Sequence, residues 1–314
     1  MSPRGGRLLF LFLDGVGIGR ADDGNPFYTG NARFLPCWAG AGPLPDGTPL
    51  RPIRADVGLD GVPQSATGQT ALFTGARGEE LGPAPASGYP GKGLRRLLRE
   101  RGLLALARNR GRQARFFNAY PLHESLFTGE HVHLEGDGSL RFSDEFPAAF
   151  RRRLSVTSVM MLSIGQHPAG LPAILAGEAL YQDYSNRSLR EGGLAVPEYS
   201  PERAGEILAG AQGEVVLYEY FQSDICGHRG DAAAARRLVD GLDRLLGALL
   251  ARLDPARDTL VVTSDHGNLE DLTTRGHTRN PVPFLCWGRR GGELRARVAA
   301  LEEVTPSLLT LDLI

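Results

Sequence analysis

Short apolar runs that end in polar turns dominate the hydropathy pattern of this chain. Such runs occupy residues 8–13, 215–221 and 260–263, and each is followed by an aspartate. Continuous apolar runs of this length are typical of strands that are buried on both faces of a parallel sheet. "QARFFNAY", which ends at Tyr120, and "FLCW" at 284–287 predict further strands.

Segments with helical character lie between these runs. "DAAAARRLVDGLDRLLGALLARL" has an apolar stripe, and "GKGLRRLLRERGLLALARNRG" has a similar pattern. "SPERAGEILAGA" begins with Ser200 as a helix N-cap and Pro201 at the first helical position. "PQSATGQTALFTGAR" predicts a polar turn that leads into a short helix. Helices that alternate with apolar strands predict an α/β fold, with a mostly parallel sheet covered on both faces.

Two stretches are less regular. Residues 20–63 are rich in Gly, Pro and Asp, and we expect a long excursion over the top of the sheet. Within 121–199, "LEGDGSLRF" predicts a hairpin and "SVTSVMML" a strand. We therefore predict that residues 1–120 and 200–314 form the metal-binding catalytic core, and that 121–199 is an insertion or small cap.

Acidic residues and histidines follow three of the predicted strands. The carboxyl ends of parallel strands lie along one edge of the sheet, where ligands bind in α/β proteins. A single histidine is more often structural, but a coincidence at three strand ends predicts a metal site, with enough ligands for two divalent cations. Mixed Asp and His ligands suit Mn²⁺ or Zn²⁺. The residues concerned are Asp14, Asp224, His228, Asp265, His266 and His277.

Two metals of this kind clamp the attacking and leaving oxygens of a displacement, typically at phosphorus. "QSATGQT" offers Ser65 and Thr67 as nucleophiles just before a helix, whose N-terminus favours an anion. The structural alternative is that Ser65 is only an N-cap. The residues themselves do not choose between the two hydroxyl groups.

Composition narrows the class of protein. The chain has 314 residues, and 35 basic against 36 acidic side chains give a net charge of −1, which favours neither nucleic acid nor an anionic membrane as a partner. Three scattered cysteines form no disulfide framework, so a reducing cytoplasm is the expected setting. No run approaches the ~18 apolar residues of a membrane helix.

Five motifs together resemble the alkaline phosphatase superfamily, and most closely its branch of cofactor-independent phosphoglycerate mutase and phosphopentomutase. They are "LDGVGIG", "QSATGQTALFTGAR", "SDICGH", "SDHGNLE" and "GHTRNPVP". The resemblance implies an alkaline phosphatase-like three-layer sandwich, and it selects Ser65 as the nucleophile. It also implies one metal held by Asp14, Ser65, Asp265 and His266, and another held by Asp224, His228 and His277.

The same resemblance implies that Asn268 and Glu270 support the site, and Arg275 or Arg187 is a candidate for stabilising transition-state charge. The expected activity is hydrolysis of a small phosphoric ester through a phosphoserine. The alternatives are a phosphomutase and a non-catalytic metal-binding homologue. The interval from Arg77 to Asp224 is shorter than the transferase domain of phosphoglycerate mutases. A mutase must exclude water while its substrate reorients, so a modest insertion favours a hydrolase.

Overall fold

The structure, a computed structural model, describes residues 6–83 and 88–314 and contains a six-stranded sheet and a two-stranded hairpin. The strands are β1 (Arg7–Leu13), β2 (Arg51–Ile53), β3 (Ala114–Phe116), β4 (Val132–Leu134), β5 (Leu140–Phe142), β6 (Val215–Tyr220), β7 (Asp258–Thr263) and β8 (Val282–Gly288). The order in the large sheet is β2-β8-β7-β1-β6-β3. Strand β1 pairs in parallel with β6 and β7, and β3 pairs in parallel with β6. Four strands paired in parallel therefore end at one edge of the sheet, while β8 is antiparallel to both of its neighbours, β7 and β2.

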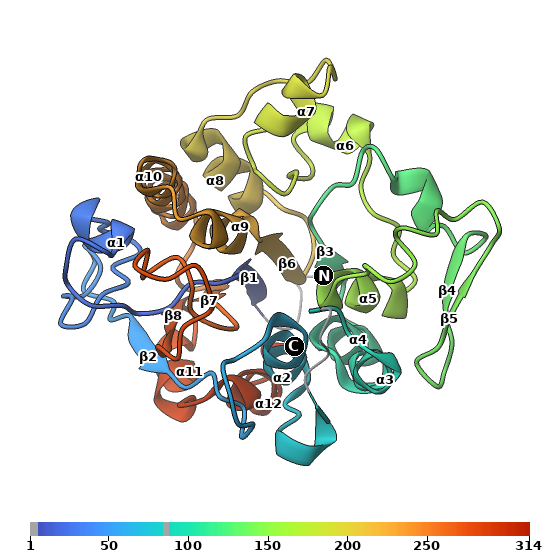
Figure 1. The fold of residues 1–314 in the computed structure, drawn as a ribbon, viewed down its shortest axis with the longest axis horizontal. Coiled ribbons are helices and arrows are strands. Elements are labelled where there is room, and N and C mark those ends of the chain that lie inside the picture. Colours follow the sequence, from blue (N-terminus) through green and yellow to red (C-terminus); the bar gives the residue numbers. More distant parts are fainter. Residues whose placement is uncertain (1–5, 84–87) are drawn as a thin grey trace.

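Helices cover both faces of this sheet (Figure 1). The α-helices are α1 (Pro26–Thr29), α2 (Ser65–Thr74), α3 (Lys92–Arg101), α4 (Leu103–Asn109), α5 (Val156–Ser163), α6 (Leu171–Ala176), α7 (Arg187–Glu191), α8 (Pro201–Ala209), α9 (Gln222–Arg229), α10 (Ala232–Leu250), α11 (Gly291–Arg297) and α12 (Val304–Thr310). The short 3₁₀ helices are η1 (Gly78–Glu80), η2 (Glu124–Phe127) and η3 (Leu301–Glu303).

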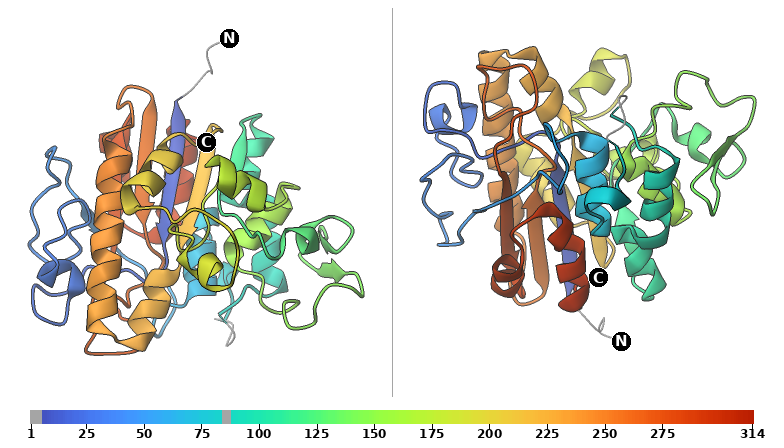
Figure 2. Two further views of the ribbon diagram at one scale, coloured as in Figure 1. Left: turned by 90° about the horizontal axis from the view of Figure 1, so that it is seen from above. Right: turned by 60° about the horizontal axis from the view of Figure 1, so that its bottom comes forward.

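Alternate side chains of β1 enter two separate cores, as the period of a strand requires. Phe10 and Phe12 pack with α2, α3 and α12 on one face, whereas Leu9 and Leu11 pack with α8 and α10 on the other. Figure 2 shows the sheet between these two helical layers. The predicted three-layer α/β sandwich with a mostly parallel sheet is confirmed.

The prediction of a strand at 155–162 is wrong, because these residues form helix α5. The hydroxyl of Ser155 caps this helix by accepting from the N–H of Ser158 (3.1 Å). The apolar side chains Val156, Val159 and Met160 are all buried in the core beside α3 and α4. A helix that is apolar on several sides has no clear 3.6-residue period, so its sequence cannot be told from a buried strand.

The predicted hairpin at 134–142 is confirmed by β4 and β5, which lie at the periphery in Figure 1. The segment 20–63, predicted as an excursion over the top of the sheet, also contributes strand β2 to the edge of the sheet. Pro52 is acceptable there because an edge strand needs fewer N–H groups for the ladder. The division into a core and an insertion at 121–199 stays a prediction. Across the two described ranges, no helix is both long and apolar enough to cross a lipid bilayer.

Candidate metal centre

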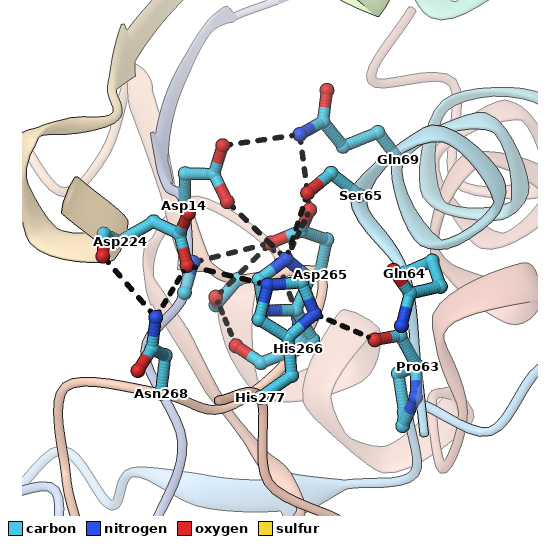
Figure 3. Close-up of polar contacts among 12 residues, drawn as sticks. Asp14, Pro63, Gln64, Ser65, Gln69, Asp224, Asp265, His266, Asn268 and His277 are labelled. Carbon is cyan, nitrogen blue, oxygen red and sulfur yellow. Dashed lines mark hydrogen bonds and ion pairs between the residues drawn. The ribbon is translucent and has the colours of Figure 1, made fainter. Parts of the chain in front are cut away.

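The residues that follow the parallel strands converge at the carboxyl edge of the sheet. Asp14 follows β1, α9 begins just after β6, and Asp265 follows β7. Figure 3 shows the labelled side chains of this site pointing toward one another from these separate elements. Potential ligand atoms lie within 4.8 Å of one another in two overlapping groups. One group is Asp224, His228 and His277, and the other is Asp14, Asp224 and His266.

Hydrogen bonds orient the two histidines around Asp224. The Nδ1 of His228 donates to the carbonyl of Arg275 (2.7 Å), and the Nδ1 of His277 donates to the carbonyl of Pro63 (2.9 Å). A carbonyl only accepts, so the proton of each neutral ring is on Nδ1 and the lone pair is on Nε2. The two Nε2 atoms lie 3.3 and 3.6 Å from the carboxylate oxygens of Asp224. This tautomer is the one that a metal ligand needs.

His266 lies at the centre of the second group. Its Nε2 is 2.9 Å from the Oγ of Ser65, 3.4 Å from the Oδ1 of Asp14 and 3.5 Å from the Oδ2 of Asp265. The ring is fully buried and stacks on His277 with centroids 3.7 Å apart. Burial, with a smaller effect of the neighbouring His277, lowers the pKa of His266 to about 3. This ring is therefore neutral, and its Nε2 is available as an acceptor or a ligand.

The carboxylates of the site are close together and poorly hydrated. Burial and then the neighbouring Asp265 and Asp224 raise the pKa of Asp14 well above its usual value. Burial is also the main cause that raises the pKa of Asp265 to about 7. The Oδ1 of Asp14 is buried without a hydrogen-bond partner. Clustered buried carboxylates with lone pairs from neutral imidazoles form a donor set that fits divalent cations.

Asn268 and Glu270 support this arrangement. The Nδ2 of Asn268 donates to the Oδ1 of Asp224 (2.7 Å). Glu270 is buried, and its carboxylate accepts from the N–H of Gly17 (2.7 Å) and of Asn268 (2.8 Å). A Cβ on Gly17 would lie 2.4 Å from Glu270, so the two loops approach each other closely only because this residue is glycine.

The two predicted arginines differ from that expectation. Arg275 contributes its backbone carbonyl to His228, not its guanidinium. The guanidinium of Arg187, on α7, pairs with Glu198 at 3.3 Å. Within the described ranges the guanidinium of Arg187 forms no hydrogen bond or ion pair with the candidate ligands, so a role for either guanidinium stays a prediction.

The sequence did not identify three residues of the site, which are Gln69, Glu219 and Thr157. The Nε2 of Gln69 donates to Asp265 (3.0 Å) and Asp14 (3.3 Å), and its position four residues after Ser65 on one helix face could have revealed it. Glu219 is a charged residue inside the apolar run of β6, which is itself a signal. Its buried carboxylate accepts from the hydroxyl of Thr157, and burial raises its pKa to about 7.

A cavity of about 590 Å³ opens on the site, and Asp14, Ser65 and Asp224 form part of its lining. Thr67, the other candidate nucleophile, is buried, and its Oγ1 donates to the carbonyl of Gln64 (3.1 Å). Of the two hydroxyl groups that the sequence offered, the one on Ser65 faces the cavity.

Comparisons with known proteins find a metalloenzyme family over part of the chain. Residues 202–312 match the model of the metalloenzyme superfamily. The 2,3-bisphosphoglycerate-independent phosphoglycerate mutase of Halobacterium salinarum is 38% identical over 111 residues, which are 33% of this chain and 22% of that protein. The mutase of Paracoccus denitrificans is 36% identical over 125 residues, 38% of this chain and 24% of that protein. The matched part thus spans less than a quarter of these relatives' length.

Solved structures share the fold along most of the chain. Alkaline phosphatase from the Antarctic bacterium TAB5 has a TM-score of 0.54 at 14% identity, with 98% of both chains covered. Phosphoglycerate mutase of Leishmania mexicana has a TM-score of 0.50 at 14% identity, with 99% of this chain and 96% of that chain covered. At such low identity these likenesses concern the fold alone. Residues 202–312 are thus similar to the metalloenzyme superfamily, and most of the chain shares the fold of alkaline phosphatase.

Proposed function

We propose that this protein is a two-metal-dependent hydrolase of phosphoric esters that acts through a phosphoserine at Ser65. The observation that carries the proposal is the position of the Ser65 hydroxyl. It faces the cavity at the first residue of α2, and its Oγ is 2.9 Å from the Nε2 of His266. A nucleophile, a metal-ligand set and a cavity for the substrate therefore meet at one point.

The donor set supports two cations, Mn²⁺ or Zn²⁺. Asp14, Ser65, Asp265 and His266 would hold one cation, and Asp224, His228 and His277 the other. Asp224 belongs to both clusters of potential ligand atoms. When bound, the cations supply charge neutralisation for the phosphoryl group and for the attacking and leaving oxygens.

The start of α2 contributes its own electrostatics. The first N–H groups of a helix have no acceptor within the helix, and here no side chain caps them. These groups and the helix dipole favour negative charge beside Ser65, both on its oxygen and on a phosphoryl group. Ser65 can then attack phosphorus in line, the ester oxygen leaves with the alcohol, and water later releases phosphate from the serine.

The exposure and the charge of the cavity favour hydrolysis over a mutase reaction. A mutase must shield the phosphoserine from water while the substrate turns. Leu122 and Phe150 line this cavity, yet 57% and 36% of their surfaces are exposed, so water reaches its mouth. Arg153 is the only arginine or lysine among the described residues of the lining, and a single cation is a poor match for the clamp of a sugar-acid phosphate.

The test is phosphate release from a panel of phosphoric esters with Mn²⁺ or Zn²⁺, together with acid-quench mass spectrometry of the peptide that contains Ser65. We expect turnover and a phosphorylated peptide. Ser65→Ala should abolish both, whereas Thr67→Ala is the matched control. It should keep turnover and lose about 1 kcal/mol of stability with its hydrogen bond to Gln64. Full activity of Ser65→Ala would refute the proposed mechanism.

A further inference from the structure

Part of the cavity wall, formed by residues 120–156 and Ile225, carries several apolar and aromatic side chains. The cavity volume of about 590 Å³ is in the range of small-molecule sites, which hold much more than a phosphoryl group. The apolar side chains come from residues 120–156 and from the first turn of α9. They are Tyr120, Leu122, Phe127, Phe150, Leu154 and Ile225.

Two of these side chains are unusually exposed. Leu122 and Phe150 are two of only five large hydrophobic residues that are exposed in the described ranges, and both line the cavity. Large exposed apolar side chains gathered at the mouth of a cavity are typical of a ligand site. The aromatic rings of the lining pack against one another: Phe150 lies edge-on against His123 with centroids 4.8 Å apart, and Phe127 lies 5.7 Å from Tyr120.

Some of the polar groups in this lining form hydrogen bonds within the protein. The Oγ of Ser155 caps α5, and the hydroxyl groups of Ser158 and Tyr120 lie 3.4 Å apart. Glu219 accepts from Thr157. His123, Arg153, Tyr181 and Gln182 also line the cavity and offer polar groups elsewhere. The apolar side chains themselves offer no partner to a sugar hydroxyl group, and an unpaired hydroxyl against them would be unfavourable.

From this wall we infer that the substrate is a phosphoric ester of an alcohol with an aromatic or other apolar group, which is seated between Leu122, Phe127 and Phe150. The inference rests on the proposed function, since it identifies the class of alcohol that the same site accepts. An aromatic or aliphatic group of the substrate would leave water when it enters this cavity. Its burial would add to the binding affinity without any further charged partner.

The experiment compares 3-phenylpropyl phosphate with n-propyl phosphate under Mn²⁺. The two leaving groups are primary alkoxides of similar basicity, so any difference reports on binding of the phenyl group. We expect kcat/KM to be about tenfold or more higher for the phenyl substrate, as burial of one aromatic ring predicts. Phe150→Ala and Leu122→Ala should each reduce this ratio several-fold. Leu175→Ala, on α6, is the matched control, because Leu175 is 54% exposed and lies outside the lining.

The outcomes separate the two claims. If both esters turn over with equal kcat/KM, the inferred substrate class is wrong and the hydrolase proposal stands. If neither ester turns over, the hydrolase proposal fails, and titration calorimetry with 3-phenylpropylphosphonate and propylphosphonate decides the inference. Tighter binding of the phenyl compound that weakens in Phe150→Ala supports it, and equal binding overturns it.

Discussion

Removal of the His277 side chain tests the metal centre most directly. His277→Ala deletes the Nε2 that lies 3.6 Å from Asp224, the hydrogen bond to Pro63 and the stack on His266. A structural zinc site with four ligands binds with about 10–16 kcal/mol, or about 2.5–4 kcal/mol per ligand. The affinity of the cation position shared with Asp224 and His228 should therefore fall by about two to three orders of magnitude.

The fold should survive this change. The lost hydrogen bond is worth about 1 kcal/mol and the lost ring stack about 1 kcal/mol, against a stability of about 5–15 kcal/mol for a typical domain. The position built on Asp14, Asp265 and His266 keeps these three ligands. The variant should thus be a folded protein that binds about one equivalent of metal in place of about two.

The assay is elemental analysis after dialysis against buffers with a fixed free Mn²⁺ concentration, alongside thermal unfolding. That concentration is set about tenfold above the dissociation constant of the unaltered protein. His133→Ala is the matched control, because the side chain of His133 on β4 is 52% exposed and lies outside both ligand groups. Retention of about two equivalents with unchanged activity in His277→Ala would show that His277 is not a ligand.

Three further changes follow from the same contacts. Glu270→Gln weakens the acceptor that joins the loops at Gly17 and Asn268, so metal affinity should fall about 10- to 100-fold in a metal titration; unchanged affinity would contradict a supporting role. Gly15→Ala places a Cβ 2.6 Å from Asp224 at a φ of +69°, so chemical denaturation should show a loss of about 1–2 kcal/mol or more. The pKa of Glu219 is about 7 in the folded protein, against an ordinary value of 4.5. In metal-free protein the folded state therefore retains a proton that the unfolded state releases between these pH values. Stability falls as pH rises through that window, and Glu219→Gln should gain about 3 kcal/mol relative to the unaltered protein between pH 4.5 and pH 8; a pH-independent difference would refute this.

The amino-acid sequence alone determined the elements whose signals are local. The apolar runs of β1, β6 and β7 predict buried strands, because apolar side chains on both faces of a strand are stable only when both faces are shielded from water. Ser200 and Pro201 specify the start of α8 through contacts within one turn. The acidic residues after these strands pointed to one edge, because parallel strands end together.

Tertiary structure decided everything that depends on partners far along the chain. Helix α5 is helical because its apolar surface fills a space between helices that the sequence does not reveal. The tautomer of His277 is set by Pro63, 214 residues away, and Gln69 reaches Asp265 across 196 residues. The sequence does not distinguish Ser65 from Thr67 as a nucleophile. In the fold the hydroxyl group of Ser65 faces the cavity, whereas that of Thr67 donates to a backbone carbonyl. Hydrogen bonds act over about 3 Å, so only the folded chain determines which groups form them.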